Sequence, residues 1–512
     1  MHRCLAVPEL VGLVCSHLQG PRHLTIDFEI GRPKRGDLAV LARTSTVFSS
    51  HAIRLIWNSV TLWNLLSCLP SGSFELKRTG EGYLTKYTMR LLRPLRSSDF
   101  DRVLVHAPLV KHLFSDPQLA DLSSVFPSVS HWLSENMLPN LQSLDWMYRE
   151  EDFQYIDCVL TPRLTTIHIP HTSLAALTLV SSLALRCPQL TDILFFPRGA
   201  PDLQALAVSA VSACVRGLHG IERLSADTLD RPALNHLSRL PSLRYLRLSE
   251  IPPILSTHDD EGTFSSLQTL YFSSEIESPS RFFEWGNKIP LVNFTAECPA
   301  FSTADEVQRL FSAAAGAISH SSLTEFTFAD EFGSRNDASD TANRLIRSSS
   351  LCRLFCFANL TDVSVLSAVG IDLDDAVVTD MARSWRCIER LELQTYYGTP
   401  APRATLQCLE AFPKYCPHLV KLSIAFDATV IPTTHGGLVL ESLKSLDVES
   451  SPITTALPVA RFIASIFPRL KDITTLIDSL DGDAEWEADL GPETLEYEGY
   501  WKEVALMYAS LA

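Results

Sequence analysis

The sequence lacks the features by which membrane proteins, disulfide-rich proteins and the common enzyme classes are recognised. Hydrophobic residues make up 46% of it, yet no apolar run approaches the roughly 20 residues that a bilayer-spanning helix requires. The 12 cysteines are scattered and form no CxxC pair, which favours reduced thiols in a cytoplasmic or nuclear protein. No GxxxxGKS/T, GxSxG or HExxH motif occurs, so the sequence predicts no catalytic site, no metal and no cofactor.

Positive charge is also scarce. The chain carries 43 lysines and arginines against 59 aspartates and glutamates, a formal net charge of -16. Such a surface repels a phosphate backbone, so nucleic acid is not an expected partner. With only 20% charged residues the chain can bury an extensive core, but 512 residues are too many for a single compact one. Several domains or one array of repeats must therefore be considered.

The sequence does contain a recurring phrase. A proline or small polar residue precedes Leu-x-x-hydrophobic-x-hydrophobic at residues 139–144, 188–194, 241–248, 266–272, 322–328, 417–424, 442–448 and 468–473. Leu243 and Leu267 lie 24 residues apart, and Leu419, Leu443 and Leu470 are separated by 24 and 27. These intervals fall in the range of the leucine-rich repeat, in which each unit contributes a strand and a helical segment.

The end of each phrase reads as a strand whose side chains alternate between two faces. In the copy at 241–248, Leu246 and Leu248 are expected to point inward, and Tyr245 and Arg247 outward. Helical stretches such as 174–186 and 404–415 stop at a proline, which cannot continue a helix. The expected fold class is therefore α/β, an irregular leucine-rich-repeat solenoid. A closed α/β barrel is the alternative, although it would need eight evenly sized units.

Four segments interrupt or flank this pattern. Residues 87–95 are expected to be helical, and residues 110–114 to form a degenerate first repeat. The segment 330–350, rich in Ser, Asp and Asn, is typical of a loop between repeats. The acidic string 481–489 has the clustered oxygens that calcium prefers, but Trp486 stands where the calcium loop needs glycine. A solvated acidic face is expected there.

The first sixty residues predict a separate helical module. Leu10, Leu13 and Leu18 recur at helical spacing, and Pro8 suits the first turn of their helix. Two further apolar helical patterns follow, after Asp37 and from Val47 to Trp57. The predicted organisation is a helical module at 1–60, a linker with a degenerate first repeat at 61–138, and a repeat solenoid with a C-terminal cap at 139–512.

This module resembles an F-box. The resemblance lies in Val7-Pro8-Glu9-Leu10, in Leu38-Ala39-Val40-Leu41-Ala42-Arg43-Thr44, and in Phe48 and Trp57. With the repeats behind it, the chain resembles the leucine-rich F-box-like proteins of mushroom-forming fungi. The resemblance implies docking onto the Skp1 adaptor of a cullin complex. The positions that it assigns to adaptor binding are Pro8, Leu10, Leu13, Leu18, Leu38, Leu41 and Trp57.

Three functions are consistent with these features. The first is a non-catalytic substrate-recognition subunit of an SCF-type ubiquitin ligase, in which the repeats hold an unidentified target protein. The second is a leucine-rich scaffold whose helical module only caps the solenoid. The third is an enzyme on an α/β repeat frame, which would need polar groups converging in a deep pocket. The outward strand positions expected to contact a target are His168, Tyr245, Arg247, Tyr271, Glu392, Lys421 and Asp447.

Overall fold

The computed structural model is a mixed α/β fold organised around a large parallel sheet. It describes residues 7–17, 35–79, 86–114, 120–130, 137–147, 150–170, 173–195, 201–252, 263–330, 341–367, 369–395, 402–432, 437–479 and 492–511. The chain divides into two units, Met1–Ser225 and Ala226–Ala512, and each is considered separately below.

The main sheet has fifteen described strands, which follow one another in sequence order. Residues of the first unit contribute β1 (Ser59–Thr61), β4 (His112–Phe114), β6 (Ser143–Asp145), β7 (Thr166–Ile169), β8 (Asp192–Phe195) and the start of β9 (Arg223–Thr228). The second unit contributes β10 (Tyr245–Glu250), β11 (Thr269–Ser273), β12 (Asn293–Cys298), β13 (Glu325–Asp330), β15 (Asp362–Ser367), β17 (Arg390–Thr395), β18 (Lys421–Ser423), β19 (Ser445–Asp447) and β20 (Asp472–Thr474). The order is linear with β1 and β20 at its ends, so the described strands form an open sheet and the closed-barrel alternative is wrong.

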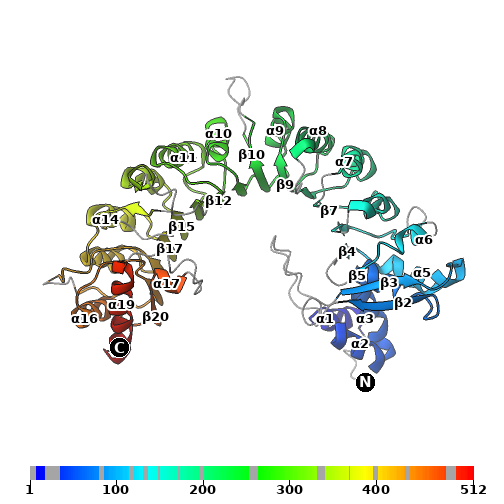
Figure 1. Cartoon of the computed structure of the whole chain (residues 1–512), viewed down its shortest axis with the longest axis horizontal. Coiled ribbons are helices and arrows are strands. Elements are labelled where there is room, and N and C mark those ends of the chain that lie inside the picture. Colours follow the sequence, from blue (N-terminus) through cyan, green and yellow to red (C-terminus); the bar gives the residue numbers. More distant parts are fainter. Residues whose placement is uncertain are drawn as a thin grey trace. The chain divides into compact units, whose positions relative to one another are not determined.

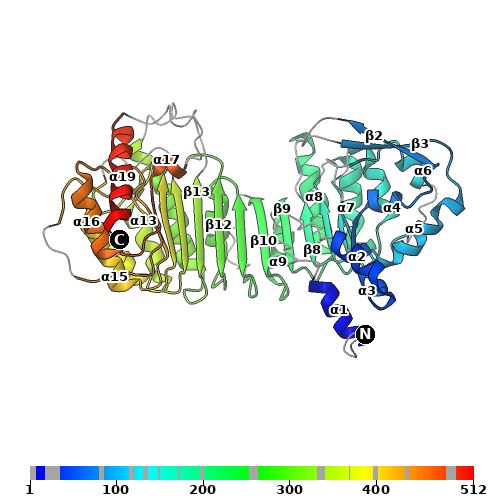
Figure 2. The ribbon, with the colours of Figure 1, turned by 90° about the horizontal axis from the view of Figure 1, so that it is seen from below.

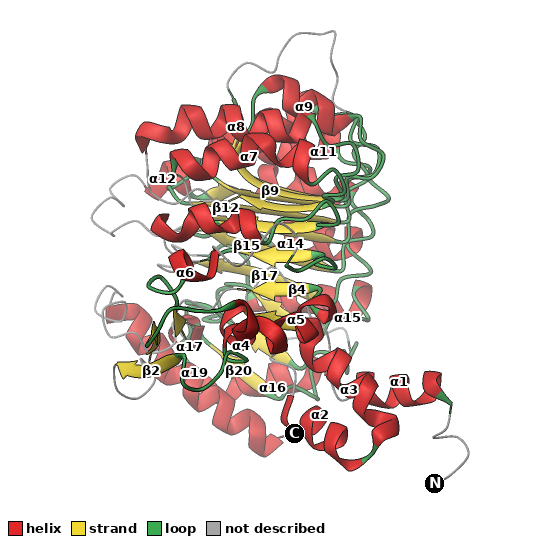
Figure 3. Cartoon of the chain, turned by 90° about the vertical axis from the view of Figure 1, so that its right-hand side faces the viewer, coloured by secondary structure: helices red, strands yellow, loops and turns green. Residues whose placement is uncertain are grey.

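Helices lie on one face of the strands in each unit (Figure 1), and Figure 3 distinguishes the two kinds of element by colour. The first unit contains α1 (Pro8–His17), α2 (Arg35–Thr44), α3 (Thr46–Asn58), α4 (Leu62–Leu66), η3 (Ser97–Phe100), α5 (Asp101–His106), η4 (Ala107–Leu109), α6 (Phe126–Ser130), η5 (Glu150–Cys158), α7 (Leu174–Arg186), η6 (Pro201–Leu203) and α8 (Gln204–Arg216). The second contains α9 (Arg231–Ser238), α10 (Glu277–Trp285), α11 (Ala304–Ala317), α12 (Thr341–Arg344), α13 (Ser348–Leu351), η8 (Cys352–Cys356), α14 (Asp375–Ser384), η9 (Leu406–Glu410), α15 (Ala411–Tyr415), α16 (Ala456–Ile466), α17 (Leu476–Ser479) and α19 (Pro492–Leu511). None of these helices is long and apolar enough to cross a membrane.

The repeated phrase explains the register of the sheet in the second unit. Leu246 pairs with Leu270, and Leu270 pairs with Phe294 on the next parallel strand. All three side chains are completely buried on the face that carries the helices. A shift of one residue between neighbouring strands would turn these apolar side chains to the other face of the sheet. The buried row therefore fixes the register of each strand against the next. The predicted strands at 241–248 and 266–272 are thus confirmed, and Figure 2 shows several neighbouring strands side by side.

The predicted helices are confirmed with small changes. The helix expected at 174–186 is α7, and its N-cap Ser173 accepts a hydrogen bond from the Ala176 amide at 3.1 Å. Pro188 follows its C-cap residue Cys187, as expected for a helix stop. The stretch 404–415 divides into η9 and α15.

The helix expected at 87–95 is wrong. Residues Lys86–Leu91 form strand β3, which pairs antiparallel with β2 (Phe74–Thr79) and parallel with β5 (Ala120–Asp121). Met89 is completely buried while its chain neighbour Arg90 is exposed, as expected for side chains that alternate between the two faces of a strand. Residues 112–114 are a strand of the main sheet, consistent with the degenerate repeat expected there.

The segment 330–350 is only partly described. Residues 331–340 lie outside the described residues, and so does the acidic string 481–489. The remainder is more ordered than the predicted loop, because it forms α12, α13 and the strand β14 (Ile346–Arg347). Strand β14 pairs in parallel with β16 (Ile371–Asp372), outside the main sheet.

Candidate functional site

The helical module, defined as helices α1, α2 and α3, has a small core of its own. Val11, Cys15, Leu38 and Ala52 are completely buried in it. The partly buried residues around them are Leu41, Ala42, Val47, Phe48, Leu55 and Ile56. One buried side of α1 therefore attaches that helix to α2 and α3.

A second side of α1 is also apolar, but it is exposed. Val7, Leu10, Leu13 and Val14 form what we call the α1 apolar face, and Leu13 retains 57% of its accessible surface. Leu10, Leu13 and Val14 follow the spacing of three and four residues that places side chains on one side of a helix. Exposed apolar side chains that are contiguous, rather than scattered, are typical of a protein interaction surface.

The seven residues assigned to adaptor binding do not share one environment. Leu10 and Leu13 lie on the α1 apolar face, whereas Leu38 is completely buried and Leu41 packs against the core. Pro8 begins α1, but its side chain lies outside the described set, as does all of Leu18. Leu38 consequently holds the module together and presents no contact surface to a partner.

Trp57 connects the module to the next part of the first unit. Its indole stacks on the His106 ring, with the centroids 4.1 Å apart and the planes 4° from parallel. Burial lowers the pKa of His106, which favours the neutral ring for this stacked contact. The chain continues directly from α3 into β1, and the Lys111 amide donates to the Asn58 carbonyl at 2.9 Å. Trp57 thus has a structural contact inside the chain.

On the sheet, we call the strand face opposite the buried leucine row the outward face. Arg247 pairs with Tyr271 across β10 and β11, and its guanidinium lies 4.1 Å from the centre of the tyrosine ring. The Tyr271 hydroxyl donates to the Glu297 carboxylate on the following strand. Burial and then this hydrogen bond raise the pKa of the Tyr271 phenol, so it remains a neutral donor.

A second group on the outward face lies near the C-terminal end of the second unit. The Lys421 ammonium is 2.5 Å from a Glu392 carboxylate oxygen, so these two predicted contact residues form an ion pair. Both are only partly buried and remain accessible to a partner. The structure therefore joins four of the predicted target contacts into two neighbouring-strand pairs, Arg247 with Tyr271 and Glu392 with Lys421.

The prediction that the other three contacts are exposed is wrong. Tyr245, Asp447 and His168 are all buried. In the first unit, the His168 Nδ1 atom lies 2.9 Å from Asp145 Oδ1 on the adjacent strand. Strands in a sheet are only about 4.8 Å apart, so side chains on neighbouring strands can cover an outward residue completely. The alternation of residues along one strand predicted correctly which face each side chain points to, but it did not predict how much of that side chain is exposed.

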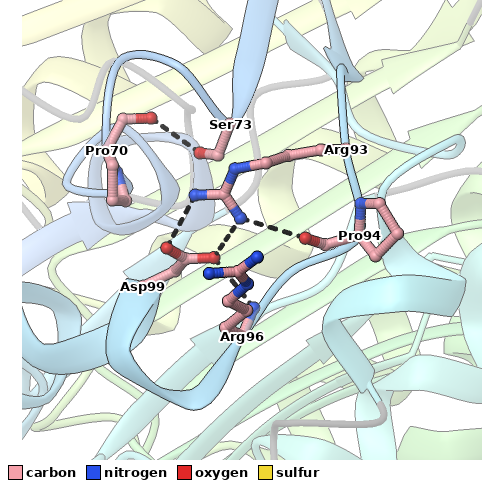
Figure 4. Close-up of polar contacts among 6 residues, drawn as sticks. All are labelled: Pro70, Ser73, Arg93, Pro94, Arg96 and Asp99. Carbon is pink, nitrogen blue, oxygen red and sulfur yellow. Dashed lines mark hydrogen bonds and ion pairs between the residues drawn. The ribbon is translucent and has the colours of Figure 1, made fainter.

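Sequence reasoning missed a buried acidic residue in the first unit. Both Asp99 carboxylate oxygens accept from the Arg93 guanidinium, at 2.7 and 2.8 Å, and the Arg96 amide donates to it at 2.8 Å (Figure 4). The Arg93 hydrogen bonds, followed by the Arg96 amide, lower the pKa of Asp99 to about 2. The Arg93 guanidinium also donates to the Pro94 carbonyl, so it fixes the turn after β3. No motif marked these residues in the sequence.

A second missed residue is Glu449, which follows β19 in the second unit. Its carboxyl accepts from the Ser423 hydroxyl at 2.7 Å and from the Thr395 amide at 3.2 Å. Burial, followed by the nearby Asp447, raises the pKa of Glu449 well above its usual value. Partners 26 and 54 residues away along the chain cannot be read from local spacing.

The described side chains hold no group of three or more His, Cys, Asp or Glu residues arranged to bind a metal ion. The described cysteines are free thiols, and Cys187, Cys214 and Cys416 are among the buried ones. No protein-family model matches the chain, and no curated protein matches it. The candidate binding sites are therefore two surfaces, the α1 apolar face and the outward face of the sheet.

Proposed function

We propose that this chain is the substrate-recognition subunit of an SCF-type ubiquitin ligase, with the helical module binding a Skp1-like adaptor. The observation that carries the proposal is the α1 apolar face. One side of α1 is consumed by the module's core, while Leu10 and Leu13 on the other side remain exposed. A helix that is apolar on two sides needs two partners, and the module supplies only one.

In this proposal the second part of the function belongs to the sheet. The regularly spaced strands, most of them preceded by a buried leucine, are consistent with the expected leucine-rich-repeat solenoid. Its outward face, with the Arg247–Tyr271 and Glu392–Lys421 pairs, would hold the target protein. The chain would act without a catalytic group of its own, in the cytoplasm or nucleus, by raising the concentration of the target near a ubiquitin-charged enzyme.

The test is co-expression of the full chain with Skp1 and a pull-down in moderate salt. Leu13→Asp places a charge on the α1 apolar face without entering the core, so we expect at least about tenfold weaker adaptor binding, or about 1.4 kcal/mol. The matched control is Leu185→Asp, since Leu185 is an exposed leucine on α7 in the same unit. Failure of the unmodified, folded chain to bind Skp1 would refute the proposal.

The leucine-rich scaffold remains the second candidate because of a specific observation. The module is attached to the sheet edge by the Trp57–His106 stack and by direct continuation of α3 into β1, the first strand of the sheet order. A module that only covers the end of a repeat array is expected to make contacts of this kind with the first strand. A cap predicts that Leu13→Asp and Leu185→Asp behave alike in every binding assay, whereas the ligase proposal predicts that only Leu13→Asp loses the adaptor.

A further inference from the structure

Glu449 has a backbone conformation that glutamate rarely adopts. It lies two residues beyond Asp447, the end of β19, with φ at 54°, in the left-handed region. A residue with a Cβ atom in this region is strained by about 1 kcal/mol. The side chain is nevertheless only 2% exposed, so the strain places a carboxyl group inside the protein. Such an arrangement indicates a specific use for the side chain.

The contacts of Glu449 join four segments of the second unit. Its Oε2 atom accepts from the Thr395 amide at the end of β17, and its Oε1 atom accepts from Ser423 at the end of β18. Its own amide donates to Asp447 Oδ1 on β19 at 2.9 Å. Its carbonyl accepts from the Leu476 amide at the start of α17, at 3.2 Å. One residue therefore ties together the carboxyl ends of three parallel strands and the segment that follows the fourth.

The groups facing Glu449 disfavour a negative charge there. From β19 the facing group is Asp447, from β17 it is Glu392, and from β18 the only cation is Lys421, which pairs with Glu392 at 2.5 Å. On α17, Asp478 accepts from the Thr475 amide. Within the described part of the chain, no lysine, arginine or histidine forms an ion pair with Glu449. The two hydrogen-bond donors favour the charged form, but they do not balance full burial of a charge beside the Asp447 carboxylate.

We propose that Glu449 is a proton-dependent latch: protonated, it holds the ends of β17, β18 and β19 together, and loss of its proton releases them. The released carboxylate is repelled by Asp447 and Glu392 and gains hydration by leaving its site. Release frees the Thr395 amide and the Ser423 hydroxyl, which are the two groups that the carboxyl ties to β19. This inference does not depend on adaptor binding.

The sign of the pH dependence follows from linkage. The pKa of Glu449 is raised in the closed state and ordinary in the open state, so the open state binds fewer protons. The stabilisation is complete below the ordinary glutamate pKa of about 4.3. As the pH rises from there to the closed-state pKa, the closing equilibrium constant falls by up to about tenfold per pH unit. Above the closed-state pKa no further loss is expected.

The experiment is amide hydrogen exchange on the full-length chain from pH 5 to pH 8, corrected for the intrinsic pH dependence of exchange. Protection of the Thr395 amide should fall with rising pH in the unmodified chain and stay constant in Glu449→Gln, which keeps the shape of the side chain but cannot ionise. The control Glu389→Gln removes an exposed glutamate just before β17 and should retain the fall. Identical pH profiles for the unmodified chain and Glu449→Gln would overturn the latch.

Two further variants separate a latch from an ordinary buried hydrogen bond. Ser423→Ala removes a donor that favours the charged carboxylate, so it should raise the pKa of Glu449 and move the loss of protection at Thr395 to higher pH. Asp447→Asn removes a neighbouring charge and lowers the pKa of Glu449, so the fall should end at a lower pH. A purely structural role predicts that neither change moves the pH at which protection is lost. This series remains decisive if Glu449→Gln folds poorly.

Discussion

The helical module and the sheet of the second unit bury their apolar side chains to different degrees. Among the described side chains of the module, Val11, Cys15, Leu38 and Ala52 are the completely buried ones, while the α1 apolar face remains exposed. In the sheet, each inward row is buried across strand after strand, from Leu246 to Phe294 and beyond. The sheet satisfies its own hydrophobic surface, whereas the module leaves one surface available to a partner.

This difference has an energetic meaning. Apolar surface contributes about 25 cal/mol per Å² when it leaves water, so an exposed leucine stabilises an assembly only when a partner covers it. A side chain buried in the sheet instead stabilises the folded chain itself, without a partner. Substitutions in the sheet should therefore change folding, and substitutions on the α1 apolar face should change binding.

The largest effect is expected from Phe294→Ala in the sheet. Phe294 is completely buried, and its ring centre lies 4.9 Å from that of Phe283 and 5.4 Å from that of Phe326. Loss of the ring leaves a cavity that neighbouring strands cannot close, so the free energy of unfolding should fall by about 3–5 kcal/mol. Chemical denaturation of the full chain measures this, and a change below about 1 kcal/mol would contradict the description of the core.

The control for Phe294→Ala is Thr295→Ala on the same strand. Thr295 lies on the outward face and is only partly buried. Its truncation should cost less than about 1 kcal/mol. If both variants lost the same stability, the alternation of inward and outward residues would not decide the energetics of this strand.

A smaller effect is expected from Leu38→Ala in the module. Leu38 is completely buried, but much of the core around it is only partly buried and can relax into the vacated space. We expect a loss of about 2 kcal/mol, at the low end for a leucine truncation. The measurement is amide exchange across residues 35–58. Val40→Ala, at a position 57% exposed on the same helix, serves as the control and should leave exchange unchanged.

The comparison also explains which parts of the fold the sequence could predict. The strands at 241–248 and 266–272 were predictable because the apolar alternation that defines them also makes the core. The strand β3 was not, because Tyr87 to Leu91 alternate over a short stretch that also permits a helical reading. The positions of the strands follow from the local pattern of apolar residues. They are easier to predict in the main sheet because that pattern recurs there many times.

The exposure of side chains was less predictable than their direction. Arg247 and Tyr271 were assigned correctly to the outward face, but Tyr245 on the same face is buried. Asp447 is buried as well, next to a glutamate that no pattern marked and whose contacts reach strand β17. Burial of this kind depends on residues from distant segments. A single sequence shows these residues without showing that they meet.

The smallest effect is expected from Asp99→Asn, which tests the pairing of the buried Asp99 carboxylate with Arg93 in the first unit. Asparagine retains one acceptor but turns an N–H group toward the Arg93 fork, so the turn after β3 should become less stable at neutral pH. Asp101→Asn, an exposed neighbour, should have no such effect. Thermal unfolding of the three proteins at pH 7 measures the difference.

The pH dependence of Asp99→Asn distinguishes this carboxyl from the one at Glu449. The pKa of Asp99 is about 2, below the ordinary value because Arg93 pairs with its charged form. The folded state then binds fewer protons than the unfolded state, so the stabilisation is complete above about pH 4 and is lost as the pH falls toward 2. In the described part of the chain no cation pairs with Glu449, whose raised pKa makes its contribution to stability fall as the pH rises. An unmodified chain and an Asp99→Asn variant with parallel stability profiles between pH 2 and pH 5 would show that the Arg93 fork does not control acid stability.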